Sequence, residues 1–279
     1  MKRKPVAVAV VVILIGALGL FFAGKSFTGG LKLPRLGPEC TVRADGEVTL
    51  DSVQMANAAT ISAVGMRRKM PERAVVVALA TAFQESKLEN LDTGDRDSLG
   101  LFQQRPSQGW GTPEKIQDPR YAADKFYAAL KKVKGWKTMR VTDAAQKVQR
   151  SAFPNAYEKW ADESEVLARA LTGRATGAVE CTVSGKPALR GAAAAAALAE
   201  VFTLDWGIEA TTAADVTVAV KDPSSGWRYA HWLVSHAETT GLERVRFADR
   251  EWTAPDGKWQ PVTGDRRVGS ETVVAEVFR

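Results

Sequence analysis

The sequence predicts a multi-domain protein: an N-terminal transmembrane helix, an all-α domain and then a smaller α+β domain. Three observations lead to this prediction. An uncharged apolar run covers residues 5–24, helical patterns dominate residues 40–181, and β-branched segments alternate with helical ones in residues 187–279. A chain of 279 residues is long enough for two domains, each with its own core.

The N-terminus is expected to anchor the chain in a membrane. Lys2-Arg3-Lys4 precedes residues 5–24, which are rich in Val, Leu, Ile and Phe. Such a run can cross a hydrocarbon core of ~30 Å, and the basic tail at residues 1–4 is expected to stay cytoplasmic. Residues 25–279 would then be extracellular, with 25–39 as a linker. A cleaved signal peptide, followed by secretion, is the alternative.

Charge argues against a nucleic-acid partner. The full chain carries a net charge of +6, and residues 1–39 supply +5 of it, with six basic residues and one acidic residue. Residues 40–279 therefore carry only +1. Because the high pI is mostly a property of the N-terminal segment, it gives little support for nucleic-acid binding.

Two cysteines delimit the first domain. Cys40 and Cys181 stand in near-identical settings, Glu39-Cys-Thr-Val42 and Glu180-Cys-Thr-Val183. An even count in an extracellular chain predicts a disulfide, which would close a loop around residues 40–181; two free thiols are the alternative. With only two cysteines and two histidines, the chain is not expected to hold zinc.

Helices are predicted throughout the first domain. Asp51 is a good N-cap for the first helix, and Pro71 with Glu72 suits the start of the second. The predicted helices cover residues 51–66, 71–86, 119–134, 141–150 and 160–172.

The helix at 71–86 ends with a carboxylate that has the features of a general acid. Before Glu85, only Arg73, Thr81 and Gln84 are polar from residue 73 onward, so the helix is expected to be buried. Apolar surroundings and the negative end of a helix both disfavour the ionised form of Glu85. A protonated carboxyl is what protonates a glycosidic oxygen. A capping or salt-bridging role is the alternative.

The motif around this carboxylate extends the argument. Gln84-Glu-Ser86 is followed, across a loop rich in Gly and Asp, by Gly100-Leu-Phe-Gln-Gln104. The pairing resembles the Gln-Glu-Ser … Gly-Leu-Met-Gln signature of soluble lytic transglycosylases and goose-type lysozymes. The chain is similar to actinobacterial transglycosylase-like extracellular proteins over about residues 50–172. This resemblance implies a lysozyme-like fold, Glu85 as the acid/base, peptidoglycan glycan strands as substrate, and no cofactor.

Substrate-binding residues follow from the same motifs. Gln103 matches the Gln that lines the sugar groove in the family, and Tyr157 lies where relatives carry an Ala-Tyr-Asn element. Glu158 stands here in place of that Asn. The predicted substrate-binding residues are Ser98, Gln103, Gln104, Gln149 and Tyr157. Three tryptophans, Trp110, Trp136 and Trp160, either fill the core or stack on sugar rings.

A second catalytic carboxylate could come from the loop after Glu85. Asp95 and Asp97 are the candidates for positioning a water in a lysozyme-like hydrolysis, although Asp in such loops commonly makes local turn bonds. The resembling transglycosylases use a single Glu, with help from the substrate's own N-acetyl group, and the muramyl 6-hydroxyl closes a 1,6-anhydro ring. Both outcomes stay open at this point.

Residues 187–279 form the predicted α+β domain. Their segment from Gly226-Trp-Arg-Tyr-Ala-His to Ala237, followed by Arg250-Glu-Trp252, resembles the fold of zinc D-Ala-D-Ala carboxypeptidases. The histidine-bearing segments of those enzymes are replaced here, in residues 213–218 and 272–277. The resemblance therefore implies a domain without metal, with wall or partner binding as its expected role.

Together these patterns predict a membrane-anchored lytic transglycosylase that cleaves the MurNAc–GlcNAc bond with Glu85. The alternative is a non-catalytic wall-binding or scaffold protein that keeps the lysozyme-like fold.

Overall fold

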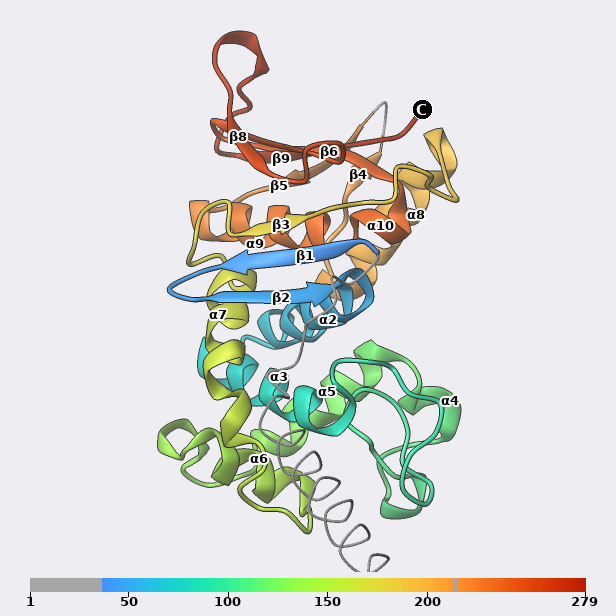
Figure 1. Cartoon of the computed structure of the whole chain (residues 1–279), viewed down its shortest axis with the longest axis vertical. Helices are drawn as coiled ribbons and strands as arrows, with labels where there is room; N and C mark the ends of the chain where they lie inside the picture. The colour runs from blue at the N-terminus through green and yellow to red at the C-terminus, as the bar shows by residue number, and fades with distance from the viewer. Residues whose placement is uncertain (1–36, 213–214) are drawn as a thin grey trace, which may run out of the picture. The chain divides into compact units, whose positions relative to one another are not determined.

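Two antiparallel sheets and a set of packed helices make up the structure, a computed structural model that describes residues 37–212 and 215–279 (Figure 1). The strands are β1 (Glu39–Arg43), β2 (Glu47–Asp51), β3 (Val179–Cys181), β4 (Thr211–Thr212), β5 (Val216–Ala219), β6 (Leu242–Phe247), β7 (Arg250–Thr253), β8 (Trp259–Pro261) and β9 (Thr272–Val277). The α-helices are α2 (Ser52–Arg67), α3 (Glu72–Ser86), α4 (Pro113–Ile116), α5 (Pro119–Leu130), α6 (Val141–Gln149), α7 (Ala161–Leu171), α8 (Gly191–Trp206), α9 (Pro223–Ser235) and α10 (Ala237–Thr240). Short 3₁₀ turns lie at Pro106–Gln108, Trp136–Thr138, Glu158–Trp160 and Gly264–Arg266.

The long helices of residues 51–172 lie where the sequence places them. The carboxylate of Asp51 accepts the Gln54 N–H at 2.8 Å, and the Gln54 side chain accepts the Asp51 N–H, which completes a capping box at the start of α2. The largest difference is α5, which ends at Leu130 rather than at 134. In the structure α2 contacts α3 and α5 on one side and α8 and α9 on another.

The prediction of an all-α first domain is wrong, because residues 39–51 and 179–181 form a three-stranded sheet in the order β2-β1-β3. In β1 Cys40 and Val42 are buried, and in β2 Val48 and Leu50 are buried, while the other residues of these strands are not. This is the period-2 pattern of a half-buried strand. Cys40 pairs with Cys181 in the β1–β3 register, and the two form the predicted disulfide.

The disulfide spans 141 residues and closes a loop that contains Glu85. On the chain-entropy account, a loop of this length stabilises the folded state by about 5 kcal/mol. The bond also fixes β3 next to β1, so that the end of the first predicted domain is tied to its beginning.

The C-terminal half contains both helices and strands, and its helices pack on an antiparallel sheet. The strand order of this larger sheet is β4-β5-β9-β6-β7-β8. Helix α9 contacts β6 and β9 of the larger sheet and also β3 of the smaller one. Figure 1 shows α8, α9 and α10 along the face of the larger sheet that is turned toward β1, β2 and β3. The buried side chains of Val273, Ala275 and Val277 alternate along β9 toward these helices.

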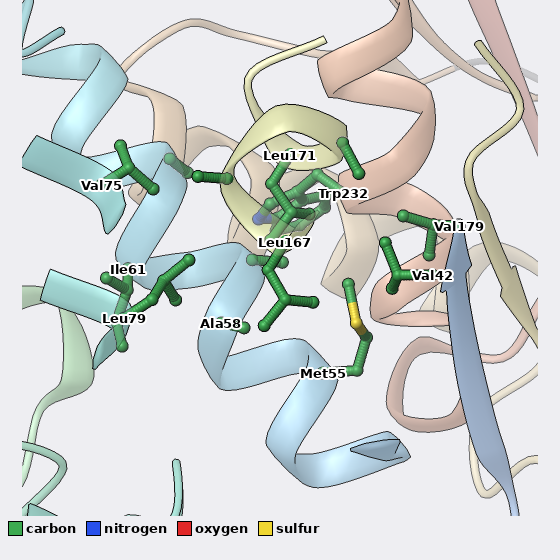
Figure 2. Packing of buried hydrophobic residues seen from close by; sticks show 14 of the residues in the cluster. Val42, Met55, Ala58, Ile61, Val75, Leu79, Leu167, Leu171, Val179 and Trp232 are labelled. Carbon is green, nitrogen blue, oxygen red and sulfur yellow. The ribbon is translucent and has the colours of Figure 1, made fainter. Parts of the chain in front are cut away.

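A single hydrophobic core joins the two halves of residues 37–279. Figure 2 shows Ala58 and Met55 of α2 on the side of Leu167 of α7, with Trp232 of α9 next to Leu167 and Ile61 beside Leu79 of α3. The predicted boundary at residues 182–186 lies in the connection between β3 and α8. The described residues are therefore one α+β unit rather than an all-α domain followed by a separate α+β domain.

The membrane prediction finds no support. No helix in residues 37–212 or 215–279 is long and apolar enough to cross a bilayer. The predicted basic tail at 1–4, the span at 5–24 and most of the linker at 25–39 lie outside the described residues. The single-pass membrane location predicted from the sequence is therefore not supported by the described residues.

Candidate active site

Glu85 lies in the last turn of a helix that is otherwise almost completely buried. Every residue of α3 from Ala74 to Phe83 is buried, and the helix packs between α2, α6 and α7. Lys87 ends the helix in the left-handed conformation (φ 58°), and Leu88 continues it (φ 63°). The chain turns sharply there, so the partly buried Glu85 side chain is held at the edge of the core.

Two side chains from a distant part of the sequence donate hydrogen bonds to the same oxygen of Glu85. The Tyr157 hydroxyl lies 2.7 Å from Oε1, and the Gln149 amide Nε2 lies 3.1 Å from it. Burial, together with the nearby Glu85 carboxylate, raises the pKa of Tyr157 well above its usual value, so its hydroxyl stays a donor. No hydrogen bond from a described residue engages Oε2, the second oxygen of Glu85.

The residue after Tyr157 supports the helix that carries Gln149. The carboxylate of Glu158 accepts the Thr142 N–H at 3.0 Å in the first turn of α6. A carboxylate is favoured at a helix N-terminus by the helix dipole and by the unpaired N–H groups there. Thr142 Oγ1 in turn donates to Pro154 O at 2.6 Å. These two hydrogen bonds connect the segment around Tyr157 to the start of α6, the helix that carries Gln149.

The Gly100-Leu-Phe-Gln segment forms a tight turn against the end of α3. Leu99 and Gln104 form a two-residue antiparallel bridge, and Ser86 Oγ donates to Leu101 O at 2.8 Å. Gln149 Nε2 also donates to Phe102 O at 2.8 Å, so one amide contacts both the turn and Glu85. Gly100 has φ 73°, and a Cβ there would meet the backbone oxygen of Ile116 at 2.8 Å. The motif glycine is thus required by the close packing of this turn.

The other predicted substrate-binding residues have structural partners. Gln104 is 1% exposed, and its Nε2 donates to Ala122 O of α5 at 3.0 Å; Ser98 is also buried. Gln103 is half-buried in the left-handed conformation, and its Nε2 donates to Gly100 O at 3.2 Å. The structure brings Gln149 and Tyr157 to Glu85. Ser98, Gln103 and Gln104 instead form hydrogen bonds within the loop or to α5, and none of these bonds is to Glu85.

The two candidate second carboxylates differ in their surroundings. Asp97 accepts hydrogen bonds from Ser107 N (2.8 Å), Ser107 Oγ (3.0 Å) and Arg105 Nε (3.0 Å), and these bonds hold its pKa far below the usual range. The carboxylate of Asp97 therefore holds two parts of the same loop together, residue 97 and residues 105–107. Asp95 is exposed, and its backbone oxygen accepts the Ser98 N–H at 3.1 Å.

An aromatic and cationic group lies at the C-terminal end of α3. Trp160 stacks on Phe83 with ring centroids 5.1 Å apart, and its Nε1 donates to Gln84 at 3.0 Å. Lys87 Nζ lies 4.4 Å from the centre of the Trp160 ring, and partial burial followed by the nearby Lys159 lowers the pKa of Lys87. Trp136 is buried, whereas Trp110 and Trp160 are half-buried. The partnership of Gln84 with Trp160 has no signal in the sequence, because 76 residues separate the two.

Both histidines are used inside the fold rather than in a site. His231 Nδ1 lies 2.8 Å from Ala170 O, and its Nε2 lies 2.9 Å from the Ala178 N–H. Nδ1 must therefore donate and Nε2 must accept, so this histidine is neutral. Burial lowers the pKa of His231 to about 4. Among the described residues, no group of three or more His, Cys, Asp and Glu side chains could hold a metal ion.

No family model matches the chain, and no curated protein sequence matches it significantly.

Proposed function

We propose that the protein cleaves the MurNAc–GlcNAc glycosidic bond of peptidoglycan as a lytic transglycosylase, with Glu85 as the general acid and base. The observation that supports this proposal most strongly is the pair of donors on one oxygen of Glu85. Because Tyr157 and Gln149 both bind Oε1, a proton on the neutral carboxyl belongs on Oε2, which no described residue engages. Oε2–H is then the group that faces a substrate.

The reaction follows from this arrangement. Oε2–H protonates the glycosidic oxygen as the C1–O bond of MurNAc breaks, and the leaving sugar departs with a free hydroxyl. The N-acetyl oxygen of MurNAc stabilises C1 in the transition state. The Glu85 carboxylate then takes the proton of the muramyl 6-hydroxyl, whose oxygen bonds to C1. This second step restores the protonated acid and gives a 1,6-anhydro product without a water.

The surroundings of the loop carboxylates support the use of a single carboxylate. A hydrolase needs a second carboxylate to activate or position a water. Asp97 is occupied by Arg105 and Ser107, so its oxygens serve the loop. Asp95 is exposed in the same loop and has no hydrogen bond to Glu85 within the part of the chain that the structure describes. The transglycosylase outcome is therefore preferred over hydrolysis.

The test is digestion of purified peptidoglycan by the full chain, followed by mass spectrometry of the released muropeptides. Anhydro ends, lighter than reducing ends by one water, are expected. Glu85→Gln is expected to abolish release, because an amide cannot donate a proton to the leaving oxygen. Glu200→Gln, an exposed change on α8, is the matched control and is expected to retain full activity.

Three outcomes would contradict the proposal. Reducing ends in place of anhydro ends would indicate a lysozyme-like hydrolase. Retained activity in the Glu85→Gln variant would exclude Glu85 as the acid. Absence of cleavage by the unmodified chain would favour the alternative of a non-catalytic wall-binding protein.

A further inference from the structure

A basic pocket of about 850 Å³ lies next to the candidate active site. Its walls come from the loop at residues 108–110, from α5 and the turn after it, and from the end of α6. The residues that matter for its chemistry are Trp110, Lys125, Lys132, Lys147, Gln149 and Arg150. Four of these six are cations, and no Asp or Glu lines the pocket.

The four cations are not neutralised by neighbouring acids. Among the described residues, none of the four forms an ion pair; Lys125 has only a ring contact, 5.1 Å from the centre of Tyr121. The two acids closest in sequence are occupied elsewhere. Asp124 pairs with Arg68, and Asp143 accepts two hydrogen bonds from Arg140, at 2.8 and 2.9 Å, although it also attracts Lys147. The pocket therefore has a local positive potential.

The net charge of the chain hides this cluster. Residues 124–150 contain eight basic residues and two acidic ones, whereas residues 40–279 carry only +1 as a whole. The excess of basic residues in this segment is balanced by acids elsewhere. A local count of charges along the sequence would have detected it.

Gln149 connects the pocket to the candidate active site. It lines the pocket, and its Nε2 donates to Oε1 of Glu85 and to Phe102 O. A glycan strand that is bound at Glu85 would therefore continue past Gln149 toward the four cations. The sugars of such a strand are neutral, and its anionic groups are the carboxylates of the peptides attached to the muramyl lactyl groups.

We propose that this pocket binds the carboxylates of the stem peptide on the glycan strand at Glu85. This inference rests on the proposed function, because it takes the substrate class from it. Arg150 can hold a carboxylate with two parallel N–H donors, and the three lysines add point charges that the flexible peptide reaches in turn. The half-buried ring of Trp110, whose backbone oxygen accepts the Tyr121 hydroxyl at 3.2 Å, offers an apolar wall for the alanine methyl groups.

The test measures binding, so that it does not depend on cleavage. A synthetic muramyl tetrapeptide with free glutamyl and C-terminal carboxylates is titrated into the full chain by calorimetry at low salt. Binding is expected to weaken at least tenfold in the triple variant Lys132→Gln, Lys147→Gln, Arg150→Gln. It is also expected to weaken as salt rises. The matched control is Lys131→Gln, Lys134→Gln, Lys137→Gln, which removes three exposed charges outside the pocket and is expected to bind normally.

Further probes separate the possible occupants. A tetrapeptide with both carboxylates amidated is expected to bind at least tenfold more weakly than the free acid. Tighter binding of poly(glycerol phosphate) or of single-stranded DNA than of the free tetrapeptide would overturn the peptide assignment. Equal binding of the tetrapeptide by both triple variants would overturn the proposal that this pocket is the binding site. If the tetrapeptide binds as expected while the chain cleaves no peptidoglycan, the proposed function fails and the pocket assignment stands.

Discussion

The hydroxyl of Tyr157 donates a hydrogen bond of 2.7 Å to Oε1 of Glu85, across 72 residues of sequence. Tyr157 is buried and Glu85 is half-buried, so the bond lies at the edge of the core, where packing limits the movement of the tyrosine ring. With Gln149 on the same oxygen, the carboxyl of Glu85 has one occupied oxygen and one that no described residue engages. This asymmetry is the basis for the assignment of the reactive proton.

Tyr157→Phe is expected to lower the rate of muropeptide release roughly tenfold to hundredfold, because one of the two groups that orient Glu85 is lost. The ring is retained, so the melting temperature should change little. Release is measured by chromatography alongside thermal unfolding. Tyr229→Phe, which removes a hydroxyl on α9, is the matched control. A Tyr157→Phe variant with full activity would show that the hydroxyl does not orient the acid.

Gln149→Ala is expected to reduce both activity and stability. The variant leaves Phe102 O without this donor, at a cost of about 1–2 kcal/mol, and it frees the Glu85 carboxyl to rotate. Gln146→Ala provides the comparison on the same helix, since Gln146 donates to Ser151 O and not to Glu85. Urea unfolding gives the stability and muropeptide release gives the rate. Equal rates in the two variants would count against the role of Gln149.

The sequence predicted the helical frame and the catalytic candidate, but not the surroundings that define the site. The Asp51 cap and the apolar run of α3 are local signals, because each depends only on residues that are close in sequence. Such signals are enough to predict where a helix begins and that it is buried. The three-stranded sheet was missed although Val48 and Leu50 alternate with polar residues, because the strands are short and β3 lies far along the chain. The partners of Glu85 come from long-range packing. The sequence motifs suggested Gln149 and Tyr157 as sugar-binding residues. Their hydrogen bonds to Glu85 are seen only in the structure.

A buried ion pair joins the two halves of the fold and gives a test of their mutual dependence. The fully buried Asp205 of α8 lies 2.5 Å from Arg120 Nε of α5, and it accepts hydrogen bonds of 2.8 Å from Thr60 of α2 and Trp232 of α9. Asp205→Ala leaves Arg120 with only its ion pair of 3.8 Å to Asp118 and removes the acceptor of the Thr60 and Trp232 hydrogen bonds. A loss of about 3–5 kcal/mol is therefore expected in urea unfolding.

The exposed change Glu209→Ala serves as the control for this measurement and should alter stability by less than about 0.5 kcal/mol. Because one core spans residues 37–279, the unmodified chain is expected to unfold in a single transition. Two separate transitions, of which Asp205→Ala affects only one, would contradict the description of these residues as one unit.

Stability is expected to fall in mild acid because His231 is buried in its neutral form between α7 and β3. Its pKa is about 4 in the folded state, and an unfolded histidine has a pKa of about 6.5. Between these values the unfolded chain binds more protons than the folded chain, so protons favour unfolding. The stabilisation is fully present above pH of about 6.5 and is lost progressively toward pH of about 4, by about 3 kcal/mol.

Urea unfolding between these pH values measures the slope, and His231→Gln removes the titration while it keeps a donor for Ala170 O and an acceptor for the Ala178 N–H. The variant should show a flatter dependence of stability on pH. Some slope should remain, because burial lowers the pKa of His236 in the same direction. An identical slope in the variant and the unmodified chain would mean that His231 is not held neutral by α7 and β3.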